Sequence, residues 1–383
     1  MKNTPSMVIF QNYFSPYRHK LFTEIAKKIT LTVVYLQKPQ EEGREWTEAA
    51  FAPTKNYTSL QMENTRLLKV GPLKQVVWVK NLRKLKEIVT PNTKVVYLDN
   101  LPTNFTMLRI ARHLNPIVPR KNRLLWEEHI LPKGSDSSIK DLYKKTFTFL
   151  LAANVDTVIS FSAMTNEYLA SLGIPLAGQK IVRTLQATYT QDEIAEFAAS
   201  AEEKRKKNAP LTFGFLGYMS KRKGLIEFMH AIHYYKNPAA RFLFVGTGPL
   251  RPALEALAKQ DARVKVVHYA TTEDEKTAYF TEMTVHVVPS EKDPWCVVVT
   301  EAACRGTVSL VSPNVGAKEL VNKIDKRFLL KNNQGITLAK AFAEVEELLK
   351  KKGEAAKLQE KTLDIAAKWS VEIAAAAFVQ AVE

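Results

Sequence analysis

Two carboxylates, Asp293 and Glu301, lie where a short apolar run gives way to a helical pattern. Residues 285–303 read VHVVPSEKDPWCVVVTEAA, so a strand is expected to end near residue 288 and a helix to begin after the loop. Ligands of open α/β sheets bind at the carboxyl ends of strands, and helix-terminal N–H groups, here those of residues 295–298, can bind phosphate. The two carboxylates could hold two hydroxyl-bearing parts of one ligand. A capping aspartate with a solvent-facing glutamate explains them too, and these residues alone favour that structural interpretation.

Three cations precede a predicted helix in the segment FGFLGYMSKRKG, residues 213–224. A strand is expected to end near Gly217, and Lys221, Arg222 and Lys223 follow it directly. Flexible cations beside a helix start could neutralise a diphosphate. Three basic residues on a surface turn are commonplace, so this feature is weak by itself.

A third feature, VGTGP at residues 245–249, places a G-x-G directly after an apolar run. It lacks the third glycine of the dinucleotide-binding fingerprint, and no acidic residue follows at the proper distance on a strand end. These differences exclude a nicotinamide-dependent dehydrogenase.

Short β-branched runs alternate with longer amphipathic segments along the chain. Runs rich in Val, Ile, Leu and Phe that are too short for helices are expected of strands buried on both faces of a parallel sheet. Two such series predict two α/β domains. The predicted strands are residues 7–10, 31–36, 94–98, 124–126, 157–161 and 180–183, followed by 211–217, 241–245, 264–268, 284–288 and 308–311. The predicted helices include residues 15–28, 103–114, 140–152, 225–235, 249–258 and 300–306.

The polar segment SAEEKRKKNAP, residues 200–210, separates the two series and is predicted to be a linker or an exposed helix end. We therefore expect an N-terminal domain over residues 1–199, a C-terminal domain over residues 211–365 and a closing helix over residues 366–383. The length of 383 residues agrees with two domains, because single cores stop growing well below that size.

The chain is strongly basic, with a net charge of +16. Residues 71–150 alone hold 15 Lys and Arg against 6 Asp and Glu, a net charge of +9. Such a charge suggests an anionic partner: nucleic acid, nucleotide phosphates or an anionic membrane. A solvated basic face explains the run about as well.

The cysteines and the apolar runs indicate the compartment. Cys296 and Cys304 are the only two cysteines and cannot form a disulfide framework, so a reducing compartment is expected. The N-terminal apolar run is too short for a signal peptide, and the other apolar runs fall well below the about 20 residues of a membrane span. These observations predict a cytoplasmic protein.

Taken together, the three features resemble the C-terminal domain of retaining glycosyltransferase family four, whose members have the GT-B fold. That family shows a strand followed by GRL-xxx-KG, a VGxGP element, a VxxxG turn, the pattern PSxxEPFGLVxxEAxAxGxPV and a GG-x-x-E loop. The corresponding segments here are residues 217–224, 245–250, 266–270, 289–309 and 315–319. The resemblance is specific over residues 211–321 and looser in the N-terminal half, through FSPYR at 14–18, LLWEEH at 124–129 and residues 158–173.

The resemblance implies two Rossmann-like parallel-sheet domains facing a cleft, with a C-terminal helix that returns to the first domain. It implies that Lys223 binds the donor diphosphate, that Glu301 binds the nucleotide ribose and that Asp293 contacts the donor sugar. The expected catalytic residues are His129, Asp293 and Lys223. The expected donor-binding residues are Tyr218, Arg222, Lys223, Tyr269, Asp293, Trp295, Cys296, Val297, Glu301 and Gly316. No metal and no other cofactor are expected.

The sequence departs from the family pattern at three positions. Asp293 replaces a glutamate and is one methylene shorter. Cys296 replaces a glycine that allows the backbone to approach the ligand closely. Tyr218 replaces an arginine, whose charge Lys221 or Arg222 could supply. These departures leave the identity of the donor open.

His129 is the candidate in the N-terminal half for the histidine that the family places near the donor sugar, with Glu127 and Glu128 as its neighbours. A structural histidine is the more common case. Arg18, in the first strand-to-helix loop, could meet a phosphate or an acidic acceptor, or could belong to an ordinary helix-start turn.

The sequence thus predicts a retaining glycosyltransferase that moves a sugar from a nucleotide-diphosphate donor, with a UDP-sugar favoured, to an acceptor hydroxyl in polysaccharide or glycolipid synthesis. Residues 103–114 and 138–151 mix apolar and basic positions, as interfacial helices do, so peripheral attachment to the inner face of an anionic membrane is expected. Packing against a sheet explains those positions equally well. The alternatives are a non-catalytic GT-B-like partner protein and a nucleic-acid-binding protein. The second is disfavoured because no recognisable nucleic-acid module is present.

Overall fold

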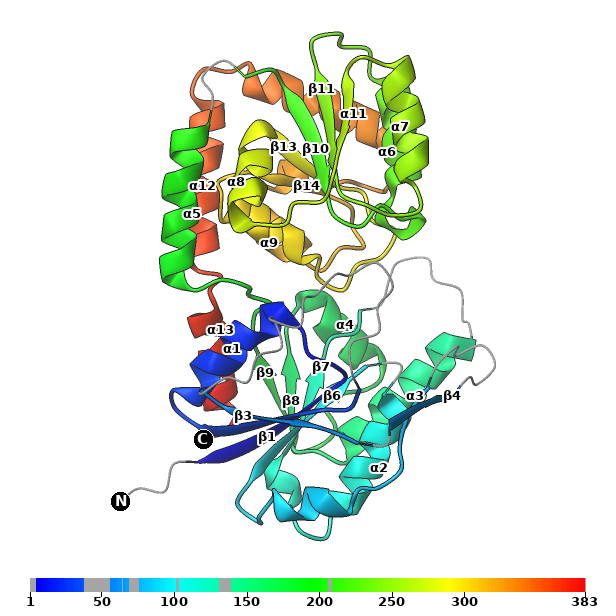
Figure 1. The fold of residues 1–383 in the computed structure, drawn as a ribbon, viewed down its shortest axis with the longest axis vertical. Helices are drawn as coiled ribbons and strands as arrows, with labels where there is room; N and C mark the ends of the chain where they lie inside the picture. Colours follow the sequence, from blue (N-terminus) through cyan, green and yellow to red (C-terminus); the bar gives the residue numbers. More distant parts are fainter. Residues whose placement is uncertain are drawn as a thin grey trace. The chain divides into compact units, whose positions relative to one another are not determined.

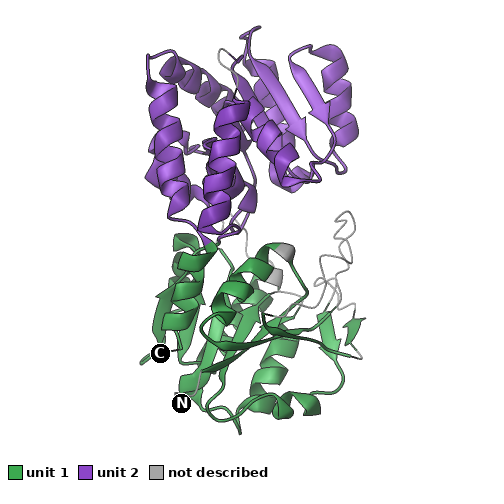
Figure 2. Ribbon diagram, turned by 60° about the vertical axis from the view of Figure 1, so that its left-hand side comes forward, with its two compact units in different colours: residues 1–186, 371–383 green, residues 187–370 purple. Residues whose placement is uncertain are grey.

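The computed structural model describes residues 5–37, 56–63, 65–68, 76–100, 103–130, 139–205 and 209–382. The chain divides into two compact units (Figure 2): unit 1 comprises Met1–Gln186 and Val371–Glu383, and unit 2 comprises Ala187–Ser370. Each unit is built around a parallel β-sheet with helices packed on it (Figure 1), which confirms the α/β fold class predicted from the sequence.

Unit 1 contains a seven-stranded sheet in the order β3-β2-β1-β6-β7-β8-β9, in which every pairing is parallel. Its strands are β1 (Ser6–Gln11), β2 (Thr30–Tyr35), β3 (Thr58–Gln61), β6 (Lys94–Asp99), β7 (Arg123–Glu127), β8 (Thr157–Ser160) and β9 (Lys180–Arg183). β4 (Thr65–Leu68) and β5 (Val76–Val79) form a separate antiparallel pair. The helices are α1 (Pro16–Ala26), η3 (Arg83–Glu87), α2 (Asn104–Leu114), η4 (Arg120–Asn122), α3 (Ile139–Ala153), α4 (Ala163–Ser171) and α13 (Val371–Gln380).

Unit 2 contains a five-stranded parallel sheet in the order β12-β11-β10-β13-β14. Its strands are β10 (Thr212–Leu216), β11 (Arg241–Val245), β12 (Val264–Val267), β13 (Val285–Val288) and β14 (Ser309–Val311). Its helices are α5 (Gln191–Lys204), η5 (Lys221–Lys223), α6 (Leu225–Tyr234), α7 (Arg251–Gln260), α8 (Glu273–Glu282), α9 (Val297–Ala303), α10 (Lys318–Ile324), η6 (Lys326–Phe328), α11 (Gly335–Leu349) and α12 (Glu354–Ala367).

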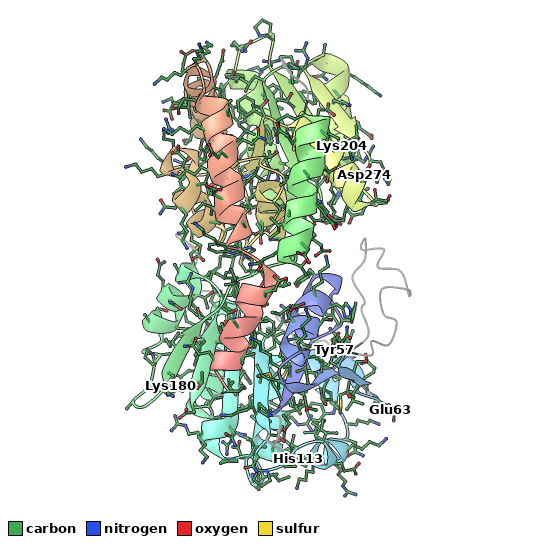
Figure 3. The ribbon with its side chains drawn as sticks, turned by 90° about the vertical axis from the view of Figure 1, so that its left-hand side faces the viewer. Tyr57, Glu63, His113, Lys180, Lys204 and Asp274 are labelled. Atoms are coloured by element: carbon green, nitrogen blue, oxygen red, sulfur yellow. The ribbon has the colours of Figure 1, made fainter. Side chains whose placement is uncertain are left out.

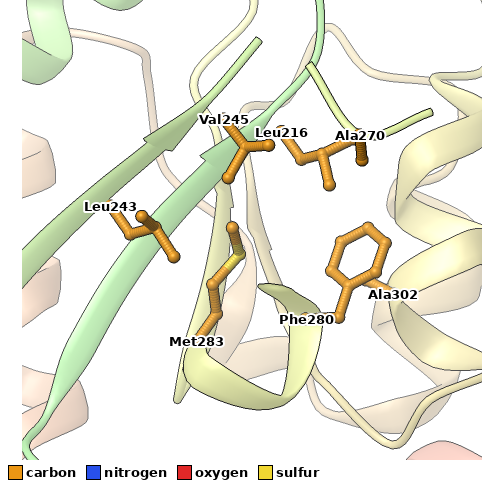
Figure 4. Packing of buried hydrophobic residues seen from close by; sticks show 7 residues of the cluster. All are labelled: Leu216, Leu243, Val245, Ala270, Phe280, Met283 and Ala302. Carbon is orange, nitrogen blue, oxygen red and sulfur yellow. The ribbon is translucent and has the colours of Figure 1, made fainter. Parts of the chain in front are cut away.

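The core of unit 2 supports the loops that follow its central strands. Leu216, Leu243, Val245, Ala270, Phe280, Met283 and Ala302 form one buried cluster, drawn in Figure 4. Gly214 of β10 has no room for a side chain, because an added Cβ would lie 2.2 Å from the side chain of Met283. The apolar strand residues read from the sequence are therefore held in a close-packed interior, which fixes where the polar loops begin.

The predicted strands match the observed ones to within one or two residues, but several helices were not predicted. Among these are α5 and α8, both of which begin with a capping box, formed by Thr190 with Glu193 and by Thr272 with Glu275. The sequence signal T-x-x-E was present in each case. α9 begins at Val297, three residues before the helix expected over residues 300–306.

The division between the units lies earlier in the chain than the predicted linker. Residues 191–204 form α5, whose last turns overlap the polar segment 200–210, and α5 belongs to unit 2. The charged residues at its end are the solvent-facing part of an amphipathic helix, which explains why the segment resembled a linker.

The chain returns to unit 1 at its C-terminus. α13 packs against α1, and the ring of Phe378 lies 4.9 Å from that of Trp126 on β7. Among the described residues, no helix combines the length and the apolar character needed to cross a bilayer.

Candidate functional site

The polar residues singled out in the second half of the sequence gather at one edge of the unit 2 sheet. β10 lies at the centre of the strand order, between β11 and β13, so the connections leave it in opposite directions. Such a switch point opens a crevice at the carboxyl ends of the two strands. The loop after β10 carries η5 with its three cations, and the loop after β13 carries Asp293.

Lys223 and Asp293 form an ion pair across this switch point. The Lys223 Nζ donates to Asp293 Oδ2 at 2.5 Å, and the two side chains are only 17% and 10% exposed. Burial lowers the pKa of Lys223, but the acidic neighbours Cys296 and Asp293 outweigh it, so the pKa is raised and the lysine stays charged. A diphosphate arriving here would meet a fixed ammonium group.

Arg222 adds a second cation beside the same carboxylate. Its Nη1 lies 3.7 Å from Asp293 Oδ2 and donates to the Lys292 carbonyl oxygen at 2.8 Å, and its side chain is about half exposed. Lys221 and Tyr218 are exposed on the same connection. Arg222 therefore brings a second positive charge to Asp293, and its role in place of the family arginine stays a prediction.

Two glycines bring the backbone of these loops close together. A Cβ on Gly224, whose φ is +72°, would lie 1.9 Å from the Pro289 carbonyl oxygen. A Cβ on Gly316 would lie 1.8 Å from the Pro294 carbonyl oxygen. Gly316 also donates its N–H to the Asp293 carbonyl oxygen at 3.0 Å. The absence of side chains at both positions lets the loop after β13 lie between its two neighbours.

Cys296 has a left-handed backbone conformation, which favours glycine. Its φ of 73° makes it the one non-glycine residue with positive φ in the described part of the chain. The thiol is buried, which raises its pKa to about 12, and Sγ lies 4.0 Å from Lys223 Nζ. The loop therefore keeps the left-handed turn, at a cost in strain of about 1–2 kcal/mol for a residue with a Cβ.

Replacing Cys296 is expected to reverse the usual order of alanine and glycine. Cys296→Gly should be more stable than Cys296→Ala by about 1 kcal/mol, because alanine keeps the strained Cβ and glycine does not. Cys304 provides the matched control, since it is buried with a helical φ of −61°, and there alanine should be the more stable replacement. Urea denaturation of the four variants measures both differences; the same order at both positions would contradict the assigned strain.

Glu301 lies about one turn into α9 and is buried in a second polar cluster, which we call the Glu301 cluster: Tyr189, Glu273, Lys276, Glu301 and Arg305. Lys276 Nζ donates to Glu301 Oε1 at 3.1 Å and to Glu273 Oε1 at 2.9 Å. The Tyr189 hydroxyl donates to Glu273 Oε2 at 2.6 Å and lies 3.3 Å from Glu301 Oε1. Arg305 donates to Glu273 Oε2 at 2.7 Å. The Glu301 carboxylate is thus buried and held by hydrogen bonds. The alternative interpretation of Glu301 as a solvent-facing acid therefore does not apply.

The other expected donor-binding residues differ in exposure. Trp295 is buried, stacks on Trp369 with 5.8 Å between ring centroids, and donates its indole N–H to Thr300 Oγ1 at 3.0 Å. Val297 is partly buried at the start of α9, and Tyr269 is exposed in the loop after β12. The side chain of Trp295 therefore has a packing role, whereas Tyr269 remains accessible to a ligand.

His129 belongs to a buried cluster in unit 1 with Asp99, at the end of β6, and Glu127, at the end of β7. His129 Nδ1 lies 2.7 Å from Glu127 Oε1 and 3.6 Å from Asp99 Oδ2. Burial lowers the pKa of His129, but the two carboxylates outweigh it and raise the pKa overall. Burial and Asp99 raise the pKa of Glu127, and the Thr148 hydroxyl donates to Asp99. The carboxylates thus take the Nδ1 side of the ring, and the catalytic role of His129 stays a prediction.

The same three side chains offer metal-ligand atoms that lie within 4.8 Å of one another. Two of these atoms lie closer together than ligands of one metal ion do. Nδ1 and Oε1, at 2.7 Å, are closer than the edge of about 3.3 Å between ligands of a tetrahedral site with bonds of about 2.0–2.1 Å. The His129 backbone N–H also donates to that Oε1 at 2.6 Å, so the oxygen is already engaged.

Arg18 is buried and neutralised within unit 1. It donates to Glu128 Oε2 at 2.5 Å and to the Gln11 side chain, and its guanidinium stacks over the ring of Trp126 at 4.8 Å. The burial and the Glu128 pair favour the alternative for Arg18, an ordinary residue of the helix-start turn, and its contact with a phosphate or an acidic acceptor stays a prediction.

The unit 2 site lies within a recognisable family segment. Residues 196–362 match the family model described as glycosyl transferases group 1. This part of the chain is a group 1 glycosyl transferase domain, and the chain is a glycosyltransferase. A comparison with the curated proteins gives no match.

Solved glycosyltransferase structures share the fold of the whole chain. Sucrose-phosphate synthase from Thermosynechococcus elongatus matches with a TM-score of 0.65 at 17% identity, over 98% of both chains. HepE from Anabaena in complex with UDP and glucose matches with a TM-score of 0.66 at 14% identity, also over 98% of both chains. An alpha,alpha-trehalose-phosphate synthase (UDP-forming) from Burkholderia xenovorans, in complex with glucose-6-phosphate, gives 0.66 at 11% identity, over 99% of this chain and all of that one. The glycosyltransferase therefore has the GT-B fold that the sequence suggested.

Sequence reasoning found the Lys223–Asp293 pair and Glu301 but missed the residues around Glu301. Lys276, Tyr189 and Arg305 come from α8, from the segment before α5 and from the end of α9, so no short motif joins them. The one available signal was Lys276 on the apolar side of a helix that was not itself predicted. The two carboxylates of the glycosyltransferase motif thus have different cationic partners.

Proposed function

We propose that this glycosyltransferase transfers a sugar from a nucleotide-diphosphate donor to an acceptor hydroxyl with retention of the anomeric configuration. The observation that carries the proposal is the buried Lys223–Asp293 pair at the switch point of the unit 2 sheet, inside the group 1 domain. This places a fixed cation and a carboxylate where nucleotides bind in open α/β sheets. Asp293 is the proposed contact of the donor sugar.

The proposed step breaks the bond between the anomeric carbon and the diphosphate oxygen, whose electron pair stays on the diphosphate. A new bond forms from the anomeric carbon to the acceptor oxygen, and the acceptor proton passes to the departing diphosphate. Lys223 and Arg222 would stabilise the charge that grows on the leaving group. When phosphate oxygens take up the Lys223 N–H groups, Asp293 becomes free to accept from a sugar hydroxyl.

A screen of nucleotide sugars tests this function. We expect one class of UDP-, GDP-, ADP- or TDP-sugar, with UDP favoured, to raise the melting temperature, and the same donor to release its diphosphate when an acceptor is supplied. The UDP ligand of the HepE structure supports that order of testing. A donor that binds without any transfer or hydrolysis would favour the non-catalytic partner protein, and no stabilisation by any donor would reject the site.

The transfer is proposed to need no metal, because Lys223 and Arg222 already supply charge to the leaving group. Treatment with excess EDTA should therefore change the rate of diphosphate release by less than about twofold, whereas removing a Lewis-acid metal would cost several kcal/mol. Adding Mg²⁺ or Mn²⁺ back to the dialysed enzyme provides the control. A loss of more than tenfold that either ion restores would contradict this proposal.

The acceptor is proposed to be lipid-linked, presented at an anionic membrane surface that unit 1 contacts from the cytoplasmic side. α3 exposes Ile139, Leu142 and Phe149, three large apolar side chains spaced along one helix, and Phe105 of the adjacent α2 is also exposed. Cations of unit 1 that remain exposed include Lys80, Arg83, Lys84, Lys86, Arg112, Arg120 and Lys121. An apolar helix face together with exposed cations is suited to an interface with anionic lipid.

Flotation with vesicles measures this attachment. The chain should float with vesicles containing one third phosphatidylglycerol at low salt, and 0.5 M NaCl should release most of it. Replacing Leu142 and Phe149 together by serine should weaken binding by tenfold or more, since each buried apolar side chain contributes about 1.5–3 kcal/mol. Ile336→Ser, at an exposed isoleucine of unit 2, is the control. Equal flotation of all three proteins would reject α3 as the contact.

A further inference from the structure

The Glu301 cluster contains a cation, Lys276, that contacts two carboxylates and lies outside the motifs named from the sequence. Lys276 projects from α8, and its Nζ lies between Glu273 Oε1 at 2.9 Å and Glu301 Oε1 at 3.1 Å. Its side chain is 17% exposed and that of Glu301 is 9% exposed. Burial lowers the pKa of Lys276, but Glu301 and Glu273 outweigh it and raise the pKa, so the ammonium stays charged in the resting site.

The two carboxylates of the Glu301 cluster differ in how many of their oxygens have hydrogen-bond partners. Both oxygens of Glu273 are engaged, Oε1 by Lys276 and Oε2 by Arg305 and Tyr189. Glu301 Oε1 is engaged by Lys276 and Tyr189. Within the described residues, Glu301 Oε2 has no hydrogen-bond partner, and it is not among the fully buried unpaired atoms, so it stays accessible.

The Lys276 ammonium, next to Glu301, also has a hydrogen-bonding position that is not filled. An ammonium group carries three N–H donors, and in the part of the chain that the structure describes only two of them have acceptors, Glu273 and Glu301. A free donor and a free acceptor therefore lie side by side, joined through the 3.1 Å contact. A hydroxyl group suits this pair, because it can accept from the ammonium and donate to the carboxylate at once.

Contacts that do not involve Lys276 hold α8 against its neighbouring helices. α5 and α8 pack together, and their ends are joined by the ion pair of Lys204 with Asp274, both labelled in Figure 3. The fully buried Arg305 further ties α9 to the Glu273 carboxylate of α8. α8 is thus joined to α5 and to α9 without Lys276. The unfilled N–H of Lys276 is therefore available to a ligand.

We infer that Lys276 is a specificity-determining residue that acts with Glu301 on a hydroxyl of the nucleotide ribose, so that the site selects ribonucleoside over deoxyribonucleoside diphosphates. The inference rests on the proposed function. A ribose hydroxyl would fill both open positions at once. A deoxyribose that lacks it would leave the third N–H of Lys276 and Glu301 Oε2 unfilled in a largely buried site, and a missing hydrogen bond to charged groups costs more than the absence of one neutral hydrogen bond.

Calorimetry with matched nucleotides tests the inference on the whole chain. The probes are UDP, 2′-deoxy-UDP and 3′-deoxy-UDP, with the GDP or ADP series in their place if those bases bind better. The unaltered protein should bind UDP about 10- to 100-fold more tightly than the one deoxy analogue that lacks the recognised hydroxyl. In Lys276→Met, UDP binding should fall about tenfold while that analogue changes less than twofold, so the preference is largely lost.

Two further variants separate recognition from packing. Lys276→Arg keeps the charge and N–H donors and should retain most of the preference for UDP. Lys265→Met removes the exposed partner of Glu282, at 3.0 Å, and should leave every affinity unchanged. A lower melting temperature with equal losses for UDP and both analogues would show that Lys276 only supports the fold and would overturn the inference. If no nucleoside diphosphate binds the unaltered protein, the proposed function itself fails.

Discussion

Replacing Lys223 by methionine is expected to lower the rate of diphosphate release from the best donor by about 100- to 1,000-fold, because it removes a fixed cation aimed at the developing charge. The loss should appear mainly in kcat, since charge on the leaving group grows only as the glycosidic bond breaks. Lys223 donates to Asp293 at 2.5 Å and has its pKa raised, so it is charged at any pH at which the enzyme would be assayed.

The same substitution leaves Asp293 partly buried without its main partner, so lower stability must be separated from lower activity. Lys223→Met should be assayed well below its own melting temperature, alongside Lys223→Met/Asp293→Asn, in which the unpaired charge is absent. The double variant should recover stability and not kcat. Lys221→Met, at an exposed cation of the same turn, should keep activity within twofold. If Lys223→Met also stayed within twofold, the switch point of unit 2 could not be the donor site.

Most strands were predictable from the sequence because they are short runs rich in Val, Ile, Leu and Phe. β9 and β11 were predicted with their exact ends. β3, by contrast, is an exposed edge strand of mixed residues, TSLQ, and lacks that signal. Patterns of apolar residues therefore located the edge strands β9, β12 and β14 as well as the central ones, and missed β3, which has no such pattern.

The site was predictable where one motif carries it and not where separate elements meet. Asp293 and Glu301 lie on one loop and helix, and the lysine of η5 is placed by the glycine that follows it. Lys276 belongs to a helix whose apolar periodicity is weak, and its contact with Glu301 spans 25 residues of sequence. A contact of that kind depends on the packing of α8 against α9, which residue types alone do not specify.

Two of the three departures from the family pattern are explained by geometry. Cys296 keeps the left-handed turn of a glycine, so the loop retains its course. Arg222 lies 3.7 Å from Asp293, so a cation other than residue 218 is present beside that carboxylate. Asp293 itself is held by Lys223, so the shorter side chain still reaches the cation of the motif. The departures thus preserve the arrangement of charge at the switch point.

Replacing Glu301 by glutamine is expected to weaken nucleotide binding by about 10- to 100-fold, since a hydrogen bond to a charged group contributes about 1.5–3 kcal/mol. Glutamine has the same shape and can still accept from Lys276, so the fold of α9 should be kept. The loss should be the same for the free diphosphate and the nucleotide sugar, because Glu301 is proposed to contact the part common to both. Calorimetry with UDP and UDP-glucose measures the two affinities.

The matched control for Glu301→Gln is Glu282→Gln. This change removes the carboxylate of α8 that pairs with the exposed Lys265 of β12, and it should leave both affinities unchanged. Equal and normal affinities in Glu301→Gln would contradict the role of Glu301 and, with it, the recognition assigned to Lys276. A loss confined to UDP-glucose would instead move Glu301 from the ribose to the sugar. The Lys223 and Glu301 variants together therefore divide the site into its two working parts, since the first should change turnover and the second affinity.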